Sequence, residues 1–248
     1  MEQTGNTILV TGAGSGIGRA LAQRWHDQGN TVIVTGRHLD KLNETVGNNA
    51  RMFTYALDVD DAAAIRSFAA RVMQEHPQLN VLVNNAGIYA AEDVTTQRDL
   101  AAAEAMLQTN LLGPIRMIDA FVDHLKLQAG AAIVNVSSGL AFVPLPAAPV
   151  YSATKAAIHS YTLALRARLE GKVEVIEIVP PQVQTELTPG QSTAEGCVPL
   201  DVFADDVMAL FAQQPTPPEI CVEQVQYFRR AEAEGQTDEA IKMMNAYS

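Results

Sequence analysis

The fold is decided near the start of the chain, by Ile8-Leu9-Val10-Thr11-Gly12-Ala13-Gly14-Ser15-Gly16-Ile17-Gly18. An apolar run typical of a buried strand leads into a turn with four glycines, and residues 17–28 have the composition of a helix. Glycines let a backbone turn tightly and approach a ligand, and the free N–H groups at a helix N-terminus attract phosphate. Although the spacing is not GxGxxG, the order of strand, glycine turn and helix predicts a nucleotide site.

The same alternation of strand and helix continues along the chain. Short apolar, β-branched runs without strict alternation indicate parallel strands covered on both faces. These runs are Ile8–Val10, Thr31–Thr35, Met52–Leu57, Val81–Val83, Ala132–Val136 and Val173–Val179. The helical stretches between them are Ile17–Gln28, Leu39–Val46, Asp61–Glu75, Arg98–Lys126 and Tyr151–Glu170. This pattern predicts an α/β fold, a doubly wound parallel sheet of Rossmann type in a single domain over residues 1–248.

The end of the chain is less regular. Pro180 and Pro181 end the sixth strand, and a long polar loop over Gln182–Pro199 follows the carboxyl end of that strand, where open sheets bind ligands. Residues 182–218 are therefore expected to form a substrate loop and lid, with a helix at 200–213. Beyond them we expect extra C-terminal helices over 219–248, at Glu219–Arg230 and Asp238–Asn245, with a short strand at 220–222 as the alternative.

Composition excludes several classes of function. The net charge of -11 is unsuited to nucleic acid, and no apolar run approaches the roughly 20 residues that span a bilayer. The two cysteines, Cys197 and Cys221, have no metal-ligand spacing, so we expect inert thiols and no metal site. A cytoplasmic protein without nucleic-acid or membrane partners is expected.

The end of the second strand selects the cofactor. An acidic residue there would bind the adenosine ribose of NAD, but Arg37 stands in that place and no carboxylate occurs before Asp40. The planar guanidinium suits a 2′-phosphate, and His38 is able to add to it. A solvated loop arginine is the alternative. NADP(H) is favoured over NAD(H), although Ser15, in the glycine turn, is neutral.

Tyr151 and Lys155 form the candidate chemical pair. They lie four residues apart in a predicted helix, so the phenol and the ammonium share one face. A nearby cation favours the phenolate, and a pKa lowered by about 2–3 would suit the phenol to proton transfer. A surface pair is the plain alternative. The fifth strand ends in Ser137 and Ser138, at the edge that carries the glycine turn; a serine there can donate to a carbonyl oxygen or simply end the strand.

Asn110 is the last candidate taken from local sequence. Pro114 has no N–H, so in a continuous helix the carbonyl of Asn110 would lose its partner. Either the helix simply kinks there, or that carbonyl holds a water that passes protons toward Lys155.

Together these residues resemble the single-domain short-chain dehydrogenase/reductase family over about Thr7 to Thr185. The resemblance rests on the glycine turn, Asn84-Asn85-Ala86-Gly87, Asn110, Ser138 and Tyr151-x-x-x-Lys155, in the order and approximate spacing of the family. It implies an oxidoreductase in which Tyr151 is the general acid/base, Ser138 binds the carbonyl, Lys155 binds the nicotinamide ribose and lowers the pKa of Tyr151, and Asn110 holds a relay water. The cofactor residues that it implies are Gly12, Ser15, Gly16, Ile17, Gly18, Arg37, Asp58, Val59, Asn85, Ala86, Gly87, Tyr151, Lys155, Val183 and Thr185.

The resemblance also implies strand bracing by Asn84 and a homo-oligomer, with a dimer through the helices at 98–126 and 151–170 favoured. The stretch Ser138–Thr188 looks most like the DltE-like branch. Two departures stand out. Pro181 replaces a common glycine, and residues 215–248 lack the usual last-strand ending rich in Gly and Asp, which makes a tetramer through that strand doubtful.

The expected reaction moves a hydride between NADP(H) and a carbonyl or alcohol carbon of a small-molecule substrate. The apolar segment 139–147 with Ile88 and Tyr89 suggests a pocket wall for an apolar or mixed ligand, although ordinary packing explains these residues as well. Two alternatives remain: a non-catalytic NADP(H)-binding redox sensor, which predicts a damaged Ser–Tyr–Lys set, and a partner-binding protein that uses its C-terminal helices.

Overall fold

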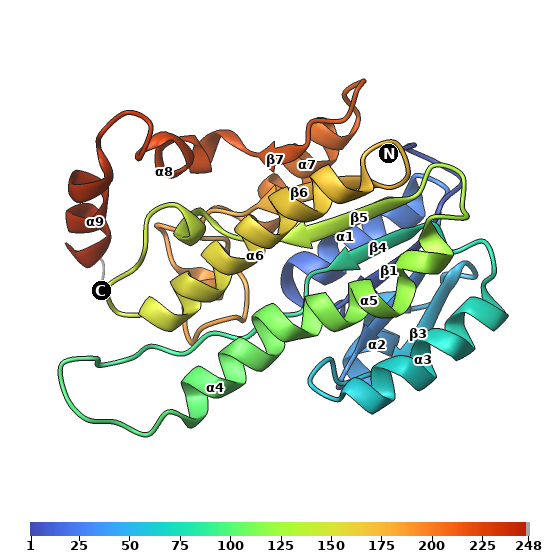
Figure 1. Cartoon of the computed structure of the whole chain (residues 1–248), viewed down its shortest axis with the longest axis horizontal. Coiled ribbons are helices and arrows are strands. Elements are labelled where there is room, and N and C mark those ends of the chain that lie inside the picture. Colours follow the sequence, from blue (N-terminus) through green and yellow to red (C-terminus); the bar gives the residue numbers. More distant parts are fainter. Residues whose placement is uncertain (247–248) are drawn as a thin grey trace.

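The computed structural model describes residues 1–246, and its apolar runs form one parallel sheet of seven strands (Figure 1). The strands are β1 (Thr7–Thr11), β2 (Thr31–Gly36), β3 (Met52–Ala56), β4 (Val81–Asn84), β5 (Ala132–Val136), β6 (Glu174–Val179) and β7 (Glu219–Cys221). Their order across the sheet is β3-β2-β1-β4-β5-β6-β7. The doubly wound parallel sheet predicted from the sequence is confirmed.

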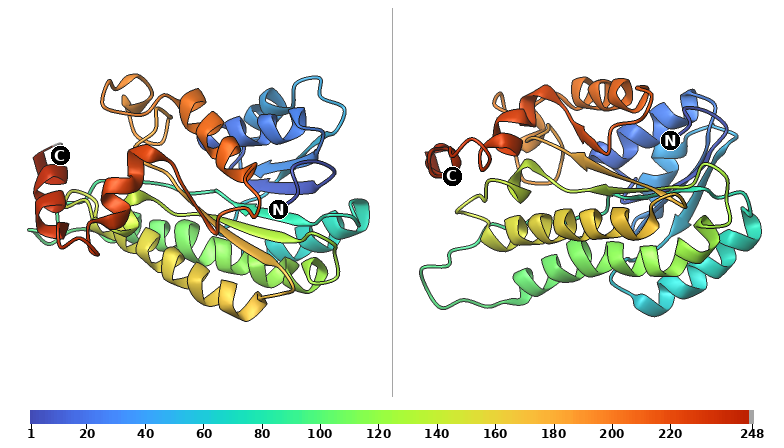
Figure 2. Two further views of the ribbon diagram at one scale, coloured as in Figure 1. Left: turned by 90° about the horizontal axis from the view of Figure 1, so that it is seen from above. Right: turned by 45° about the horizontal axis from the view of Figure 1, so that its top comes forward.

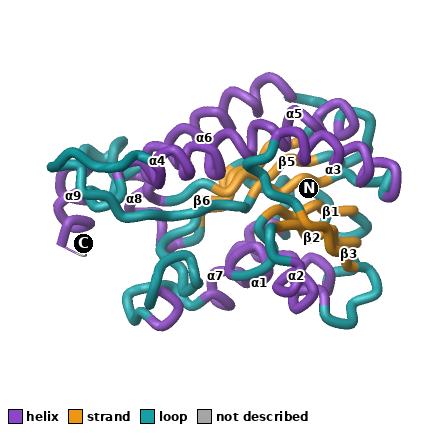
Figure 3. The backbone as a smooth tube through the Cα atoms, turned by 90° about the horizontal axis from the view of Figure 1, so that it is seen from below, coloured by secondary structure: helices purple, strands orange, loops and turns teal. Residues whose placement is uncertain are grey.

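Helices cover both faces of this sheet. The α-helices are α1 (Gly16–Asp27), α2 (Leu39–Val46), α3 (Ala62–Glu75), α4 (Ala101–Leu107), α5 (Gly113–Leu125), α6 (Pro149–Leu169), α7 (Leu200–Phe211), α8 (Gln226–Arg230) and α9 (Thr237–Ala246). Shorter turns are η1 (Gln108–Leu112), η2 (Gly139–Ala141), η3 (Gln191–Thr193) and η4 (Glu223–Val225). Helices α1, α2 and α7 lie on one face, and α3, α5 and α6 lie on the other (Figures 2 and 3).

The two helical layers explain why the strands read as unbroken apolar runs. In β1, Ile8 packs into the core around Trp25 of α1 and Phe203 of α7, whereas its neighbour Leu9 packs into the opposite core around Phe121 of α5. Every side chain of such a strand is buried, so apolar residues occupy both alternating sets. Burial on both faces, about 25 cal/mol for each Å² of apolar surface, is the main force holding the layers together.

Strand order places the functional site. The chain runs from β1 outward to β3, and then returns through α3 to pair β4 with the other side of β1. At this reversal the connections after β1 and β4 leave in opposite directions, which opens a crevice at the carboxyl ends of the two strands.

The prediction of one continuous helix over Arg98–Lys126 is wrong. The segment consists of α4, the π-helical turn η1 and α5, and it begins at Ala101 and ends at Leu125. In the π turn the N–H of Gly113 donates to the carbonyl of Gln108, five residues back. Pro114 has no N–H to give to Asn110, so the hydrogen-bond ladder widens at this point.

The predicted helix over Glu219–Arg230 is also wrong in its first half. Residues 219–221 form β7, η4 follows, and only 226–230 are α-helical. The edge of β6 offers unpaired backbone groups, and Glu219, Ile220 and Cys221 pair with Glu177, Ile178 and Val179. The short strand proposed as the alternative is therefore present, shifted by one residue.

The C-terminal helices pack against the loop that follows β5. Ala231 and Ala240 are fully buried with Val143, and Phe228, Ile241 and Met244 pack around them. Figure 1 shows α8 and α9 at the end of the molecule that carries this loop. Within residues 1–246, no helix combines the length and the hydrophobicity needed to cross a membrane.

Candidate active site

The glycine turn after β1 needs glycine for two separate reasons. Gly12 and Gly16 have φ of +65° and +51°, which side chains disfavour. In addition, a Cβ on Gly12 would lie 2.7 Å from the Cα of Ala86, and one on Gly18 would lie 2.4 Å from Nδ2 of Asn85. The turn is thus pressed against the end of β4, and larger residues would separate the two.

Asn85 clamps this turn. Its Nδ2 donates to the carbonyls of Thr11, at 3.0 Å, and Gly12, at 3.2 Å. In return, Oγ1 of Thr11 accepts the N–H groups of Asn85, at 3.0 Å, and Ala86, at 3.1 Å. Ser15, the N-cap residue of α1, makes no capping hydrogen bond with its side chain, so the first turn of that helix keeps its N–H groups for a ligand.

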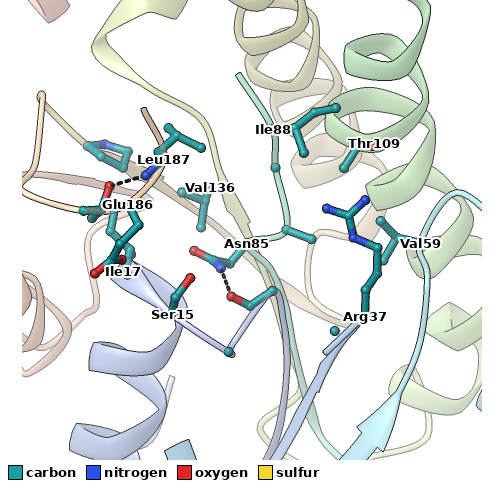
Figure 4. A pocket seen from close by; sticks show the side chains of 18 of the residues that line it. Ser15, Ile17, Arg37, Val59, Asn85, Ile88, Thr109, Val136, Glu186 and Leu187 are labelled. Carbon is teal, nitrogen blue, oxygen red and sulfur yellow. Dashed lines mark hydrogen bonds between the residues drawn. The ribbon is translucent and has the colours of Figure 1, made fainter. Parts of the chain in front are cut away.

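A cavity of about 370 Å³ begins at this turn and extends over the carboxyl ends of the strands. Figure 4 shows Arg37 with Val59 and Thr109 on one side of it, and Glu186 and Leu187 on the other. Arg37 is exposed, and within residues 1–246 it has no hydrogen bond or ion pair. Asp58 lines the same end, and its Oδ1 accepts the N–H of Asp60 at 3.0 Å.

The loop after β6 closes the cavity above α1. Val183 is buried and pairs with Val198, and Thr185 is 7% exposed. Nε2 of Gln191 donates to the carbonyl of Val183, at 2.6 Å, and to Oγ1 of Thr185, at 3.4 Å. No sequence pattern points to Gln191, which stands in a polar stretch.

Every cofactor residue predicted from the sequence except Gly18 lines this one cavity. Gly18 instead lies against Asn85 and Gly12, where it allows the close packing of α1 on the turn. Ser138, Tyr151 and Lys155 line the cavity as well. A pair of phosphates at the turn, a 2′-phosphate at Arg37 and a nicotinamide near Tyr151 fit the donors present, so these residues suit NADP(H).

The Tyr151–Lys155 pair lies as its spacing predicts. Nζ of Lys155 lies 5.6 Å from the centre of the Tyr151 ring and donates to the carbonyl of Val136 at 3.0 Å. Ser138 is 9% exposed, and its Oγ accepts the N–H of Leu140 at 3.1 Å, which leaves the hydroxyl proton for another acceptor. A Cβ on Gly87 would lie 3.9 Å from Nζ of Lys155, so the turn after β4 approaches the ammonium group.

The electrostatics differ from expectation. We expected Lys155 to lower the pKa of Tyr151; instead burial raises the pKa of that phenol, with a smaller contribution from Tyr89. Burial also lowers the pKa of Lys155 to about 8. At neutral pH the phenol therefore keeps its proton while the ammonium is still largely charged.

Asn110 is bound through its side chain. Its Oδ1 accepts the N–H of Ile88 at 2.8 Å, and its Nδ2 donates to the carbonyl of Ile88 at 2.9 Å. This bidentate contact fixes the chain after the Asn84–Gly87 turn to the π turn. Asn84 braces the sheet as expected, because its Nδ2 donates to Oδ1 of Asn135 on β5 at 2.9 Å. The water relay at Asn110 stays a prediction.

Apolar side chains gather beside Tyr151. The ring of Tyr89 meets that of Tyr151 edge-on, with centroids 5.1 Å apart. Ile88, Leu140 and Leu145 belong to the same cluster, and of these three Ile88 lines the cavity, so the substrate wall stays a prediction. Two other residues of segment 139–147 lie outside this cluster. Phe142 packs under Arg229, and Val143 packs on the C-terminal helices.

Glu92 is a site residue that the sequence did not reveal. Its side chain is 4% exposed, and it accepts the N–H of Val150, in the first turn of α6, at 2.9 Å and a bond from Arg98, also at 2.9 Å. A carboxylate at a helix N-terminus stabilises the helix that carries Tyr151. A glutamate in a polar loop reads as solvated, and its partner is 58 residues away.

Known proteins resemble the chain in sequence and in structure. A family model described as short chain dehydrogenase matches residues 6–196. An uncharacterized oxidoreductase, DltE, of Bacillus subtilis is 39% identical over 85% of this chain and 84% of its own length. Sulfoacetaldehyde reductase 2 of Chromohalobacter salexigens is 37% identical over 73% and 74%. A short chain dehydrogenase from Burkholderia cenocepacia, solved in complex with NADP, superposes with a TM-score of 0.83 at 28% identity, over 97% and 98% of the two chains.

The sheet, the glycine turn and these matches define the class: the chain belongs to the short-chain dehydrogenase/reductase family. It is an oxidoreductase of that family, and the similarity to DltE agrees with the DltE-like branch expected from the sequence.

Proposed function

We propose that this chain reduces the carbonyl group of a small, uncharged, apolar or mixed substrate with NADPH, using Tyr151 as the proton donor. The observation that carries the proposal is the meeting of Ser138, Tyr151 and Lys155 in the cavity that begins at the glycine turn. Bound NADPH would supply the hydride, which leaves binding, orientation and proton transfer to the protein.

Each side chain has a distinct task in this proposal. Ser138 donates a hydrogen bond to the carbonyl oxygen, and Tyr151 gives that oxygen its proton as the alcohol forms. Lys155 places a positive charge beside the phenolate that remains. A phenol with a raised pKa is protonated at neutral pH, so Tyr151 starts in the form that a proton donor needs. Asn110 is assigned to hold the water that returns a proton.

The substrate class follows from the wall beside Tyr151. Ile88, Tyr89, Leu140 and Leu145 are apolar or aromatic, and Arg98 already pairs with the nearby carboxylate of Glu92. An anionic substrate would meet the carboxylate of Glu186 in the cavity lining and would find Lys155 as the cation beside Tyr151. We therefore infer an uncharged aldehyde or ketone, in contrast to the sulfonate named for the Chromohalobacter relative.

The two alternatives have weaker support. A redox sensor predicts a damaged Ser138–Tyr151–Lys155 set, and the set is complete. A partner-binding protein needs free C-terminal helices, whereas Ala231 and Ala240 are buried against the chain's own Val143. We further propose that loop 182–199 acts as a lid, that the chain forms a homodimer, and that the protein is located in the cytoplasm.

A substrate panel tests this function. NADPH oxidation would be followed with matched pairs of carbonyl compounds, one uncharged and one bearing a carboxylate or sulfonate at the same chain length. We expect at least a tenfold higher kcat/KM for the uncharged member of each pair. Equal or higher rates with the anionic members would contradict the substrate class, and tight NADPH binding without turnover of any carbonyl would contradict the reductase.

A further inference from the structure

A carboxylate lies in the middle of an otherwise apolar strand. Glu177 is fully buried in β6, between Ile176 and Ile178, which are also fully buried. Taking a carboxylate out of water is unfavourable by several kcal/mol, unless charges or hydrogen bonds compensate it. An apolar residue would fill this position without that desolvation penalty, so packing alone does not explain a glutamate here.

The direct partner of Glu177 comes from the helix that carries Tyr151. Nδ1 of His159 lies 2.8 Å and 3.0 Å from the two carboxylate oxygens. Because an ionised carboxylate only accepts hydrogen bonds, Nδ1 carries the proton in this pair. His159 lies about one helical turn after Lys155, so the bond ties α6 to β6 one turn away from the residue that carries the ammonium group.

A second ion pair, between Arg229 and Glu219, lies next to the pair of His159 and Glu177. Arg229 of α8 donates to both oxygens of Glu219 on β7, at 2.7 Å and 3.1 Å, and its guanidinium lies 4.6 Å from the centre of the Phe142 ring. Ligand atoms of His159, Glu177 and Glu219 lie within 4.8 Å of one another. Arg229 already supplies the cation for Glu219, so this cluster is not assigned to a metal.

The charged and titratable groups that the described residues place around Glu177 come from three elements. They are His159 and Arg166 from α6, Glu219 and Cys221 from β7 and Arg229 from α8. Both carboxylates also act on Cys221 of β7. Burial, Glu219 and, more weakly, Glu177 raise the pKa of the Cys221 thiol to about 12.

Lys155 is a cation that interacts electrostatically with Glu177. Its Nζ binds the carbonyl of Val136, and Val136 pairs in the sheet with Ile178, the residue after Glu177. Burial lowers the pKa of Lys155, and the negative charge of Glu177 acts in the opposite direction. The other titratable group that faces Lys155 is Tyr151, on its own helix.

We propose that Glu177 is a positioning residue for the reaction: through His159 it fixes the catalytic helix on β6, and its charge holds Lys155 in the ammonium form. The inference rests on the proposed reductase, in which Lys155 must be charged when Tyr151 loses its proton. Without the negative charge of Glu177, the effect of burial on Lys155 would be unopposed, and the pKa of the ammonium group would fall further below about 8.

The test removes the charge and keeps the shape. Glu177→Gln still offers an oxygen to His159, and Glu170→Gln, at the exposed end of α6, is the matched control. An opposite charge nearby typically moves a pKa by about 1–3, so we expect the basic limb of the kcat/KM profile to move down by about one pH unit or more. Because wild-type Lys155, with a pKa of about 8, is about half charged at pH 8, activity at that pH should then fall about fivefold or more relative to wild type, with KM for NADPH changed less than twofold.

A measurement without substrate separates this inference from the proposed function. The 13Cε resonance of Lys155, assigned by its loss in Lys155→Arg, would be titrated in wild type and Glu177→Gln. A midpoint lowered by about one pH unit or more supports the proposal even if the substrate class is wrong. An unchanged midpoint together with an unchanged pH profile would overturn it and leave Glu177 a purely structural residue.

A second variant guards against misfolding of the first. His159→Gln keeps the Glu177 charge and weakens its tie to α6. We expect kcat to fall at least threefold while the titration midpoint of Lys155 stays in place. Wild-type kcat in a folded His159→Gln protein would overturn the positioning role of the pair.

Discussion

Replacing Lys155 by methionine should make the protein more stable while it removes activity. Lys155 is 6% exposed, and burial lowers its pKa from 10.5 to about 8. A pKa difference of one corresponds to about 1.4 kcal/mol, so at neutral pH the folded protein carries a charge that costs it about 3 kcal/mol. The hydrogen bond from Nζ to Val136 contributes about 1 kcal/mol in the other direction. Lys155→Met should therefore gain about 2 kcal/mol at pH 7.

The pH dependence gives this prediction its sign. The unfolded chain keeps the Lys155 proton up to pH 10.5, whereas the folded protein releases it near pH 8. Between these values the unfolded state binds more protons, so wild-type stability rises with pH. The advantage of Lys155→Met should shrink across this window. The raised pKa of Tyr151 is present in both proteins and cancels in the difference.

Thermal unfolding at pH 7 and pH 9.5 measures the effect. About 2 kcal/mol corresponds to a melting temperature higher by about 4–8 °C at pH 7 for a chain of this size, and the gap should close at pH 9.5. NADPH-dependent turnover should be lost at both pH values. A methionine variant that is less stable at pH 7, or a gap that ignores pH, would refute the reasoning from burial.

Two further substitutions test the cofactor end. Arg37→Ala should raise KM for NADPH by about tenfold to a hundredfold, because about 1.5–3 kcal/mol from charged hydrogen bonds is lost, and it should leave KM for NADH unchanged. An unaltered ratio of the KM values for NADPH and NADH would show that Arg37 does not bind the phosphate. Gly12→Ala should abolish NADPH binding in a fluorescence titration, because its Cβ would lie 2.7 Å from the Cα of Ala86. Gly5→Ala is the matched control, since Gly5 also has positive φ but has open space around it. Equal NADPH affinity in the two glycine variants would contradict the argument from close packing.

Local patterns predicted the parts of the fold that local forces determine. The central strands were readable because burial on both faces demands apolar residues throughout, and the helix predicted over Tyr151–Glu170 is α6, which begins two residues earlier at Pro149. The π turn was half readable: Pro114 shows that the ladder breaks, but not that Gly113 then bonds five residues back. The sequence predicts a helix at 219–221, whereas pairing with the free edge of β6 makes these residues strand β7; the topology creates that edge, and no local pattern shows it.

The candidate site was readable where its residues follow strand ends. Ser138 and the glycine turn come from such positions, and Tyr151 and Lys155 from one helix face. The buried carboxylates could not be found in this way. The sequence pattern points to neither Glu92 nor Glu177, because their partners are brought to them by the tertiary fold. The same limit explains the pKa of Tyr151, since no sequence pattern gives the depth at which a phenol lies.

The central claim is that Tyr151 gives the proton in an NADPH-dependent reduction, and Tyr151→Phe measures it most directly. With the best uncharged carbonyl substrate, kcat/KM would be compared in wild type, Tyr151→Phe and Tyr227→Phe, which changes an exposed tyrosine. We expect Tyr151→Phe to lose about 10²–10⁴-fold while NADPH still binds, and Tyr227→Phe to match wild type. A Tyr151→Phe enzyme within twofold of wild type would contradict the account.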